Sequence, residues 1–123
     1  MVDEFTRARD IIIRAMGALD VDTMDAAMQR TLFDVFEAIK RSVVAGQALV
    51  VGGMERTGAW TDGHAKSPQA WVADRTGGSW GEACATVELG HGLRTLPETA
   101  TRLLDGRIST AKATQVARAG TVD

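Results

Sequence analysis

The sequence is poor in the residues from which many functional sites are built. Its 123 residues include one cysteine, two histidines, no tyrosine and no asparagine. A single cysteine excludes a disulfide framework within the chain, and we interpret it as a sign of a reducing, cytoplasmic location. The longest nearly apolar run, 43–54, is too short and too rich in glycine to cross a bilayer, so we expect no membrane partner.

Few side chains are suited to hold a metal or to carry out catalysis. The candidate soft ligands are Cys84, His64 and His91, whereas a structural zinc site needs about four ligands. No serine, histidine and acid fall into a nucleophilic motif, and no phosphate-binding glycine loop occurs. We therefore predict no metal, no cofactor and no catalytic residue, so that this chain alone is not an enzyme.

Composition and charge describe an ordinary helical domain. Hydrophobic residues make up 45% of the chain and charged residues 24%, which are globular values. Two prolines and many alanines favour helix over strand. The formal net charge of -2 excludes an overall basic field that would attract nucleic acid.

Apolar residues recur with helical spacing in the N-terminal half. Residues 3–19 carry one stripe, and Asp22 is the expected N-cap of a longer helix over 23–52 with a second stripe. We predict a helical hairpin over 1–54 whose stripes form core; the alternative is self-association through this surface. The first stripe is Phe5, Ala8, Ile12, Ala15, Met16 and Leu19, and the second is Met24, Met28, Leu32, Val35, Ile39 and Val43.

Cap and turn signals predict a connector over 55–66 and four short helices over 67–120. Ser67, Ser79 and Ser109 are expected N-caps, Pro97 begins a helix with Ala100, Leu103 and Leu104 buried, and Gly106 ends it. The fold class is therefore all-α, with a long N-terminal hairpin and four short helices packed on it. We expect one domain, 1–123, that is a fragment of a longer protein.

The helices expected over 67–75 and 79–94, joined by a glycine turn, have the outline of a helix-turn-helix. The first turn of the second helix is suited to face a phosphate, but Trp80, Cys84 and Ala85 are not base-reading residues. The alternative is that the cations of this half are a solvated surface interspersed with acids. The candidate nucleic-acid contacts are Lys66, Arg75, Ser79, Arg107 and Lys112.

A series of short motifs carries a family resemblance over roughly residues 20–120. In order they are Gly58-Ala59-Trp60, Ser67-Pro68-Gln69-Ala70-Trp71, Arg75-Thr76-Gly77, Ser79-Trp80-Gly81-Glu82-Ala83, Leu96-Pro97-Glu98-Thr99-Ala100 and Gly106-Arg107-Ile108-Ser109. The series resembles domain-of-unknown-function family 222, the thirteen-E-twelve repeat family. The sequence departs from that family at Ala111-Lys112-Ala113, and Gly90 and Gly92 replace better helix formers.

The resemblance implies action on DNA, since this region of the family usually precedes an HNH endonuclease domain. The HNH motif needs clustered histidines and an asparagine, so no nuclease residue is carried over to this chain. The expected function is a non-catalytic, DNA-binding accessory module whose partners are DNA and a C-terminal nuclease domain or separate nuclease. The alternative is an interaction scaffold without nucleic-acid contact, forming a homodimer through Phe5, Ile12 and Met16.

Overall fold

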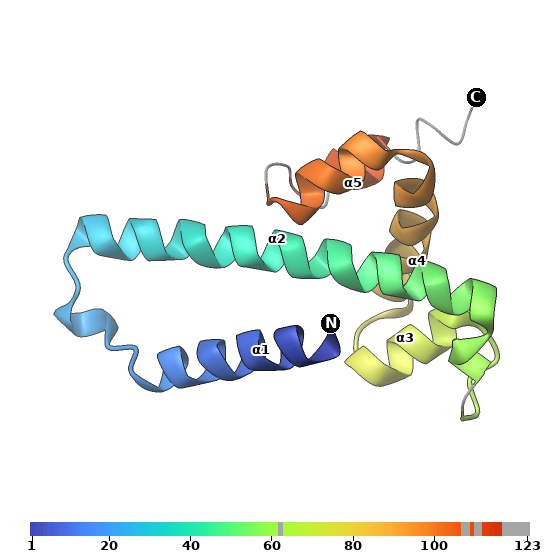
Figure 1. Cartoon of the computed structure of the whole chain (residues 1–123), viewed down its shortest axis with the longest axis horizontal. Coiled ribbons are helices and arrows are strands. Elements are labelled where there is room, and N and C mark those ends of the chain that lie inside the picture. Colours follow the sequence, from blue (N-terminus) through green and yellow to red (C-terminus); the bar gives the residue numbers. More distant parts are fainter. Residues whose placement is uncertain (62, 107–108, 110–111, 117–123) are drawn as a thin grey trace. The chain divides into compact units, whose positions relative to one another are not determined.

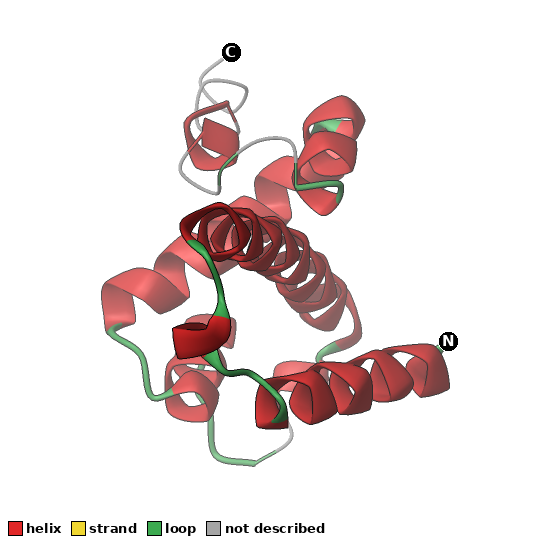
Figure 2. Cartoon of the chain, turned by 90° about the vertical axis from the view of Figure 1, so that its left-hand side faces the viewer, coloured by secondary structure: helices red, strands yellow, loops and turns green. Residues whose placement is uncertain are grey.

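The computed structural model describes residues 1–61, 63–106, 109 and 112–116 (Figure 1). These residues contain helices and no strand, which confirms the all-α prediction (Figure 2). Residues 112–116 are also helical.

The chain divides into two compact units, Met1–Asp34 (unit 1) and Val35–Asp123 (unit 2). The elements are α1 (Val2–Gly17), η1 (Val21–Thr23), α2 (Ala26–Thr57), η2 (Ala59–Thr61), α3 (Pro68–Thr76), α4 (Trp80–Thr95) and α5 (Pro97–Leu104).

The start of α2 differs from the sequence prediction. The carboxylate of Asp25, not Asp22, accepts a hydrogen bond from the Met28 N–H at 2.8 Å and caps the helix. Asp20 accepts from the Asp22 N–H at 3.2 Å and caps the short helix η1 instead. The Asp22 prediction is wrong because each nearby aspartate offers the same cap chemistry, and the inserted helical turn of η1 decides between them.

The large apolar residues of both N-terminal stripes are poorly buried. Unit 1 contains no buried residue, and Phe5 is 70% exposed. In the second stripe Met24 and Leu32 are partly buried, whereas four residues are exposed. The prediction that these stripes form core is therefore wrong. The exposed members of the second stripe are Met28, Val35, Ile39 and Val43.

The core of unit 2 is built largely from small residues. Ala45 and Ala48 of α2 pack with Leu89 and Leu93 of α4 and with Ala113. At this crossing Gly90 faces the α2 backbone: a Cβ placed on Gly90 would lie 2.4 Å from the Ala48 carbonyl oxygen. The glycines that weaken α4 as an isolated helix therefore include one that lets two helix backbones approach.

A second cluster joins α3 to α4 and to the end of α2. It contains Val51, Val72, Ala83 and Val87, all buried, with Trp71 packed against it. The cluster fixes α3 against α4, the two helices of the predicted corner.

Helix α5 is held against α2 mainly through its C-terminal end. The Ser42 hydroxyl donates to the Leu104 carbonyl, and Arg41 donates to the Gly106 carbonyl at 3.4 Å. Ala100, which was predicted to be buried, is partly buried and packs on the first core cluster. Leu104 was predicted to be buried, but its side chain is 39% exposed. The hydrogen bonds of this turn to α2 are made by its backbone carbonyls.

Candidate nucleic-acid interface and exposed apolar face

The helix-turn-helix-like corner forms as the cap signals predict. Ser67 accepts a hydrogen bond from the Ala70 N–H at 3.1 Å, and Pro68 begins α3. Gly77 ends α3 with a left-handed φ of 67°, a conformation that glycine adopts without strain. Ser79 then accepts from the Glu82 N–H at 3.1 Å and caps α4. Local chemistry alone thus determines both ends of the turn.

The second helix of the corner packs one side into the core and leaves its first turn, residues 80–82, exposed. Its buried residues extend along most of its length, from Ala83 to Leu93. A helix that reads DNA contacts base edges with exposed residues of its first turn. In α4 these exposed residues are Trp80, Gly81 and Glu82, which include no Arg, Lys, Asn or Gln, so this turn is poorly suited to direct base readout. At its start the Glu82 carboxylate reaches back to Gly78, where a Cβ would lie 2.6 Å from Oε2. This negative charge opposes phosphate binding at the N-terminus of α4.

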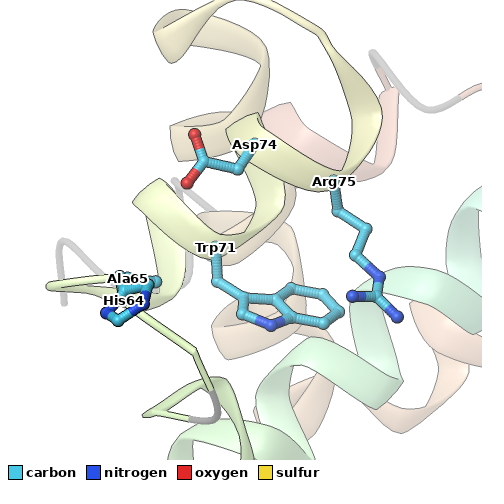
Figure 3. Close-up of a pocket in the computed structure, with 5 residues that line it drawn as sticks. All are labelled: His64, Ala65, Trp71, Asp74 and Arg75. Atoms are coloured by element: carbon cyan, nitrogen blue, oxygen red, sulfur yellow. The ribbon is translucent and has the colours of Figure 1, made fainter.

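Three of the predicted nucleic-acid contacts belong to the corner. Lys66 precedes α3, Arg75 lies in its last turn and Ser79 precedes α4, and all three are exposed. The Arg75 guanidinium lies 4.9 Å from the centre of the Trp71 ring, a cation–π contact. Figure 3 shows Arg75 extending beside the indole, while Asp74 points away from the ring. A shallow pocket is lined here by His64, Ala65, Trp71, Asp74 and Arg75.

Of the other two predicted contacts, the structure describes Lys112, which does not join this group. Lys112 is followed by Ala113, which packs on Leu89 and Leu93 in the C-terminal half of α4. Ser79 caps the opposite end of that helix, roughly 15–20 Å away along its axis at the usual rise per residue. Arg107 lies outside the described residues. The four predicted contacts that the structure describes therefore do not form one compact site.

Sequence reasoning missed a pair that joins α2 to α4. The imidazole Nε2 of His91 is hydrogen-bonded to the Glu55 carboxylate. A separation of 36 residues gives no local signal, because the pairing depends on how α2 and α4 cross. Cys84 is a free, partly buried cysteine. Among the described residues no group of three or more His, Cys, Asp or Glu side chains is placed to hold a metal.

The second feature of interest is the apolar face of α1. We use this name for Phe5, Ala8, Ile12, Ala15 and Met16. The first four follow one another at steps of three, four and three residues, and Met16 lies four residues after Ile12. Ile12 is 37% exposed and Met16 44%, so the three predicted self-association residues all lie at the surface. A face of this kind is the ordinary docking surface of an amphipathic helix.

Comparisons with known proteins place the chain in a family. The family model described as "Domain of unknown function (DUF222)" matches residues 30–121. No curated protein and no solved structure matches the chain. Within the described residues, no helix is long and apolar enough to cross a membrane. The matched range covers most of the chain, including α3, α4 and α5, and the chain therefore belongs to the DUF222 family.

Proposed function

We propose that this chain is a non-catalytic adaptor, a helical module that acts by binding other macromolecules. The observation that carries the proposal is the absence of any buried residue in unit 1. A helix in water gains most of its stability by burying an apolar face. Large apolar patches on a monomer usually mark interaction sites, and the apolar face of α1 is the strongest such candidate in unit 1.

Unit 2 supplies a different part of the adaptor. Its two core clusters join α2, α3 and α4 into a folded body. Under this proposal the folded body is the stable module, and α1 is the docking element. The family resemblance suggests what the module serves, namely a nuclease domain or a separate nuclease that acts on DNA. Metal-dependent nicking of a plasmid by the purified chain would contradict the non-catalytic part.

The apolar dye ANS tests whether this face is available in dilute solution. The wild-type chain should bind the dye with enhanced fluorescence, and Ile12→Asp should reduce that fluorescence while circular dichroism shows retained helicity. Val50→Asp is the matched control, because Val50 is 62% exposed on α2 and the same charge is introduced there. Equal fluorescence for the wild type and Ile12→Asp would count against the proposal.

Direct DNA contact is the second candidate function, and the exposed cations of the corner favour it. Lys66 and Arg75 lie at opposite ends of α3, both exposed. Such a pair suits phosphates rather than base edges, since the exposed first turn of α4 offers no cation or amide and carries the negative charge of Glu82. The proposed contact is therefore weak, independent of sequence and steeply dependent on salt.

A salt titration of DNA binding tests this second function. Arg75→Ala should lower affinity for duplex DNA and reduce the slope of log affinity against log salt by about 1, the loss of one phosphate contact. Lys112→Ala is the control, because it also removes one positive charge but at a site away from the corner. Lys112 lies next to Ala113, which packs on Leu89 and Leu93 in the C-terminal half of α4. Equal losses for the two variants would contradict a site at the corner. Absence of binding at low ionic strength would exclude DNA contact by this chain.

A further inference from the structure

We infer that the apolar face of α1 pairs with the same face of a second copy, as a short parallel two-stranded coiled coil. This inference rests on the proposed adaptor function and names its partner. The spacing of the face is the first support. Phe5, Ala8, Ile12 and Ala15 alternate steps of three and four residues and occupy positions a, d, a and d of a heptad repeat.

Residue type at these positions favours two parallel strands. Ile12 supplies the β-branched a residue of the parallel-dimer pattern, whereas the d positions carry alanine in place of leucine. The alanines at the d positions are small, so two helices can approach closely along this seam. Phe5 and Ile12 are exposed in the described chain and would become buried by the pairing.

Charge complementarity identifies the second copy as the occupant. In the same heptad register Glu4 is a g position and Arg9 is the following e position. Parallel coiled coils pair a g residue with the e residue five positions later on the other strand. Glu4 of one copy therefore meets Arg9 of the other, twice by symmetry. Arg9 is ion-paired with Asp10 at 3.0 Å, but both side chains are largely exposed, so this pair is a weak competitor.

The next flanking pair is apolar and accounts for another exposed residue. Ile11 is the second g position and Met16 the corresponding e position, so these two side chains also meet across the dimer. Ile11 is among the exposed large hydrophobic residues of the chain. The small net charge of -2 gives little repulsion between copies. The flanking residues of α1 are therefore complementary to themselves in the parallel register.

Sedimentation equilibrium over a wide range of protein concentration tests the pairing. The wild-type chain should pass from monomer to dimer. Ile12→Asp should raise the dissociation constant at least about a hundredfold, because it would place two unpaired carboxylates in the seam. Val50→Asp should leave the constant unchanged. A wild-type chain that is monomeric throughout, or an Ile12→Asp variant that dimerises normally, would overturn the inference.

Charge reversal tests the parallel register without placing a charge in the apolar seam. Glu4→Arg and Arg9→Glu should each weaken the dimer severalfold, because each creates like-charged pairs across it. The double variant should recover the wild-type constant, and a mixture of the two single variants should form heterodimers preferentially. A double variant as weak as the singles would overturn the parallel register.

The dye measurement separates this inference from the adaptor proposal. If the chain stays monomeric and its dye binding depends on Ile12, the adaptor proposal is retained. The same result rejects a second copy as the partner of α1. A monomer in which Ile12→Asp does not change dye binding rejects both. A dimer that releases the dye as concentration rises supports both.

Discussion

At the scale of single residues, two glycines with the same sequence signature have opposite roles. Gly46 and Gly90 both lie inside helices, where glycine costs stability relative to alanine. No atom outside the local helix lies within 4 Å of a Cβ placed on Gly46, whereas the Ala48 carbonyl oxygen lies 2.4 Å from one placed on Gly90. Helix propensity therefore explains the cost of Gly46, and the α2–α4 crossing explains the need for Gly90.

The two glycines form a matched pair of substitutions. Gly46→Ala should raise the free energy of unfolding by about 0.5–1 kcal/mol, because alanine is the better helix former and meets nothing. Gly90→Ala should lower it by about 1–3 kcal/mol, because the two backbones must separate to admit the methyl group. Urea denaturation followed by circular dichroism measures both values. Equal stabilisation by the two substitutions would show that α2 and α4 do not cross here.

At the scale of elements, α2 shows how far a hydrophobic pattern identifies a core. Its large apolar residues Met28, Val35 and Val43 keep helical spacing, yet they are exposed. The residues it buries are Ala45, Ala48, Val51 and Gly52. Small residues carry a weak hydrophobic signal, but they permit close helix approach. Periodicity therefore predicts the helix correctly and assigns the wrong half of it to the core.

The N-terminus of α2 gives a prediction at this scale. Asp25→Ala should lower the free energy of unfolding by roughly 0.5–2 kcal/mol, because it removes the acceptor for the Met28 N–H. Asp22→Ala should change it far less, since Asp22 donates its backbone N–H to the Asp20 carboxylate and the substitution keeps that N–H. Thermal melts of both variants, followed by helical circular dichroism, provide the comparison. A larger effect for Asp22→Ala would reinstate the cap expected from the sequence.

Local signals in the sequence predicted the short helices well, but they did not predict which residues make contacts between helices. The caps at Ser67, Ser79 and Ser109 form as expected, because each depends on residues within three positions. The Glu55–His91 pair and the Ala48–Gly90 contact join residues far apart in sequence. Such contacts depend on helix crossing, which periodicity does not encode. The same limit applies to the candidate site. Ser79 caps the start of α4, whereas Lys112 precedes Ala113, which packs on Leu89 and Leu93 in the other half of that helix.

At the scale of the whole molecule, stability is distributed unevenly between the two units. The buried side chains of the described residues all lie in unit 2, from Ala45 onward. Unit 1 is helical but buries none of its residues. An element of this kind is suited to binding because its apolar surface remains to be covered. The proposed division of labour, a folded body and a docking helix, follows from this distribution.

Native-state hydrogen exchange provides the prediction for the whole molecule. In dilute solution the amides of α1 should exchange much faster than those around Leu89 and Leu93, because local opening of α1 exposes no buried side chain. Protection of α1 should rise with protein concentration in the wild-type chain, since pairing with a second copy would bury its apolar face. The Ile12→Asp variant should show no such rise. Strong protection of α1 in dilute solution, unchanged by Ile12→Asp, would mean that its face is already covered within one chain, and the adaptor proposal would then fail.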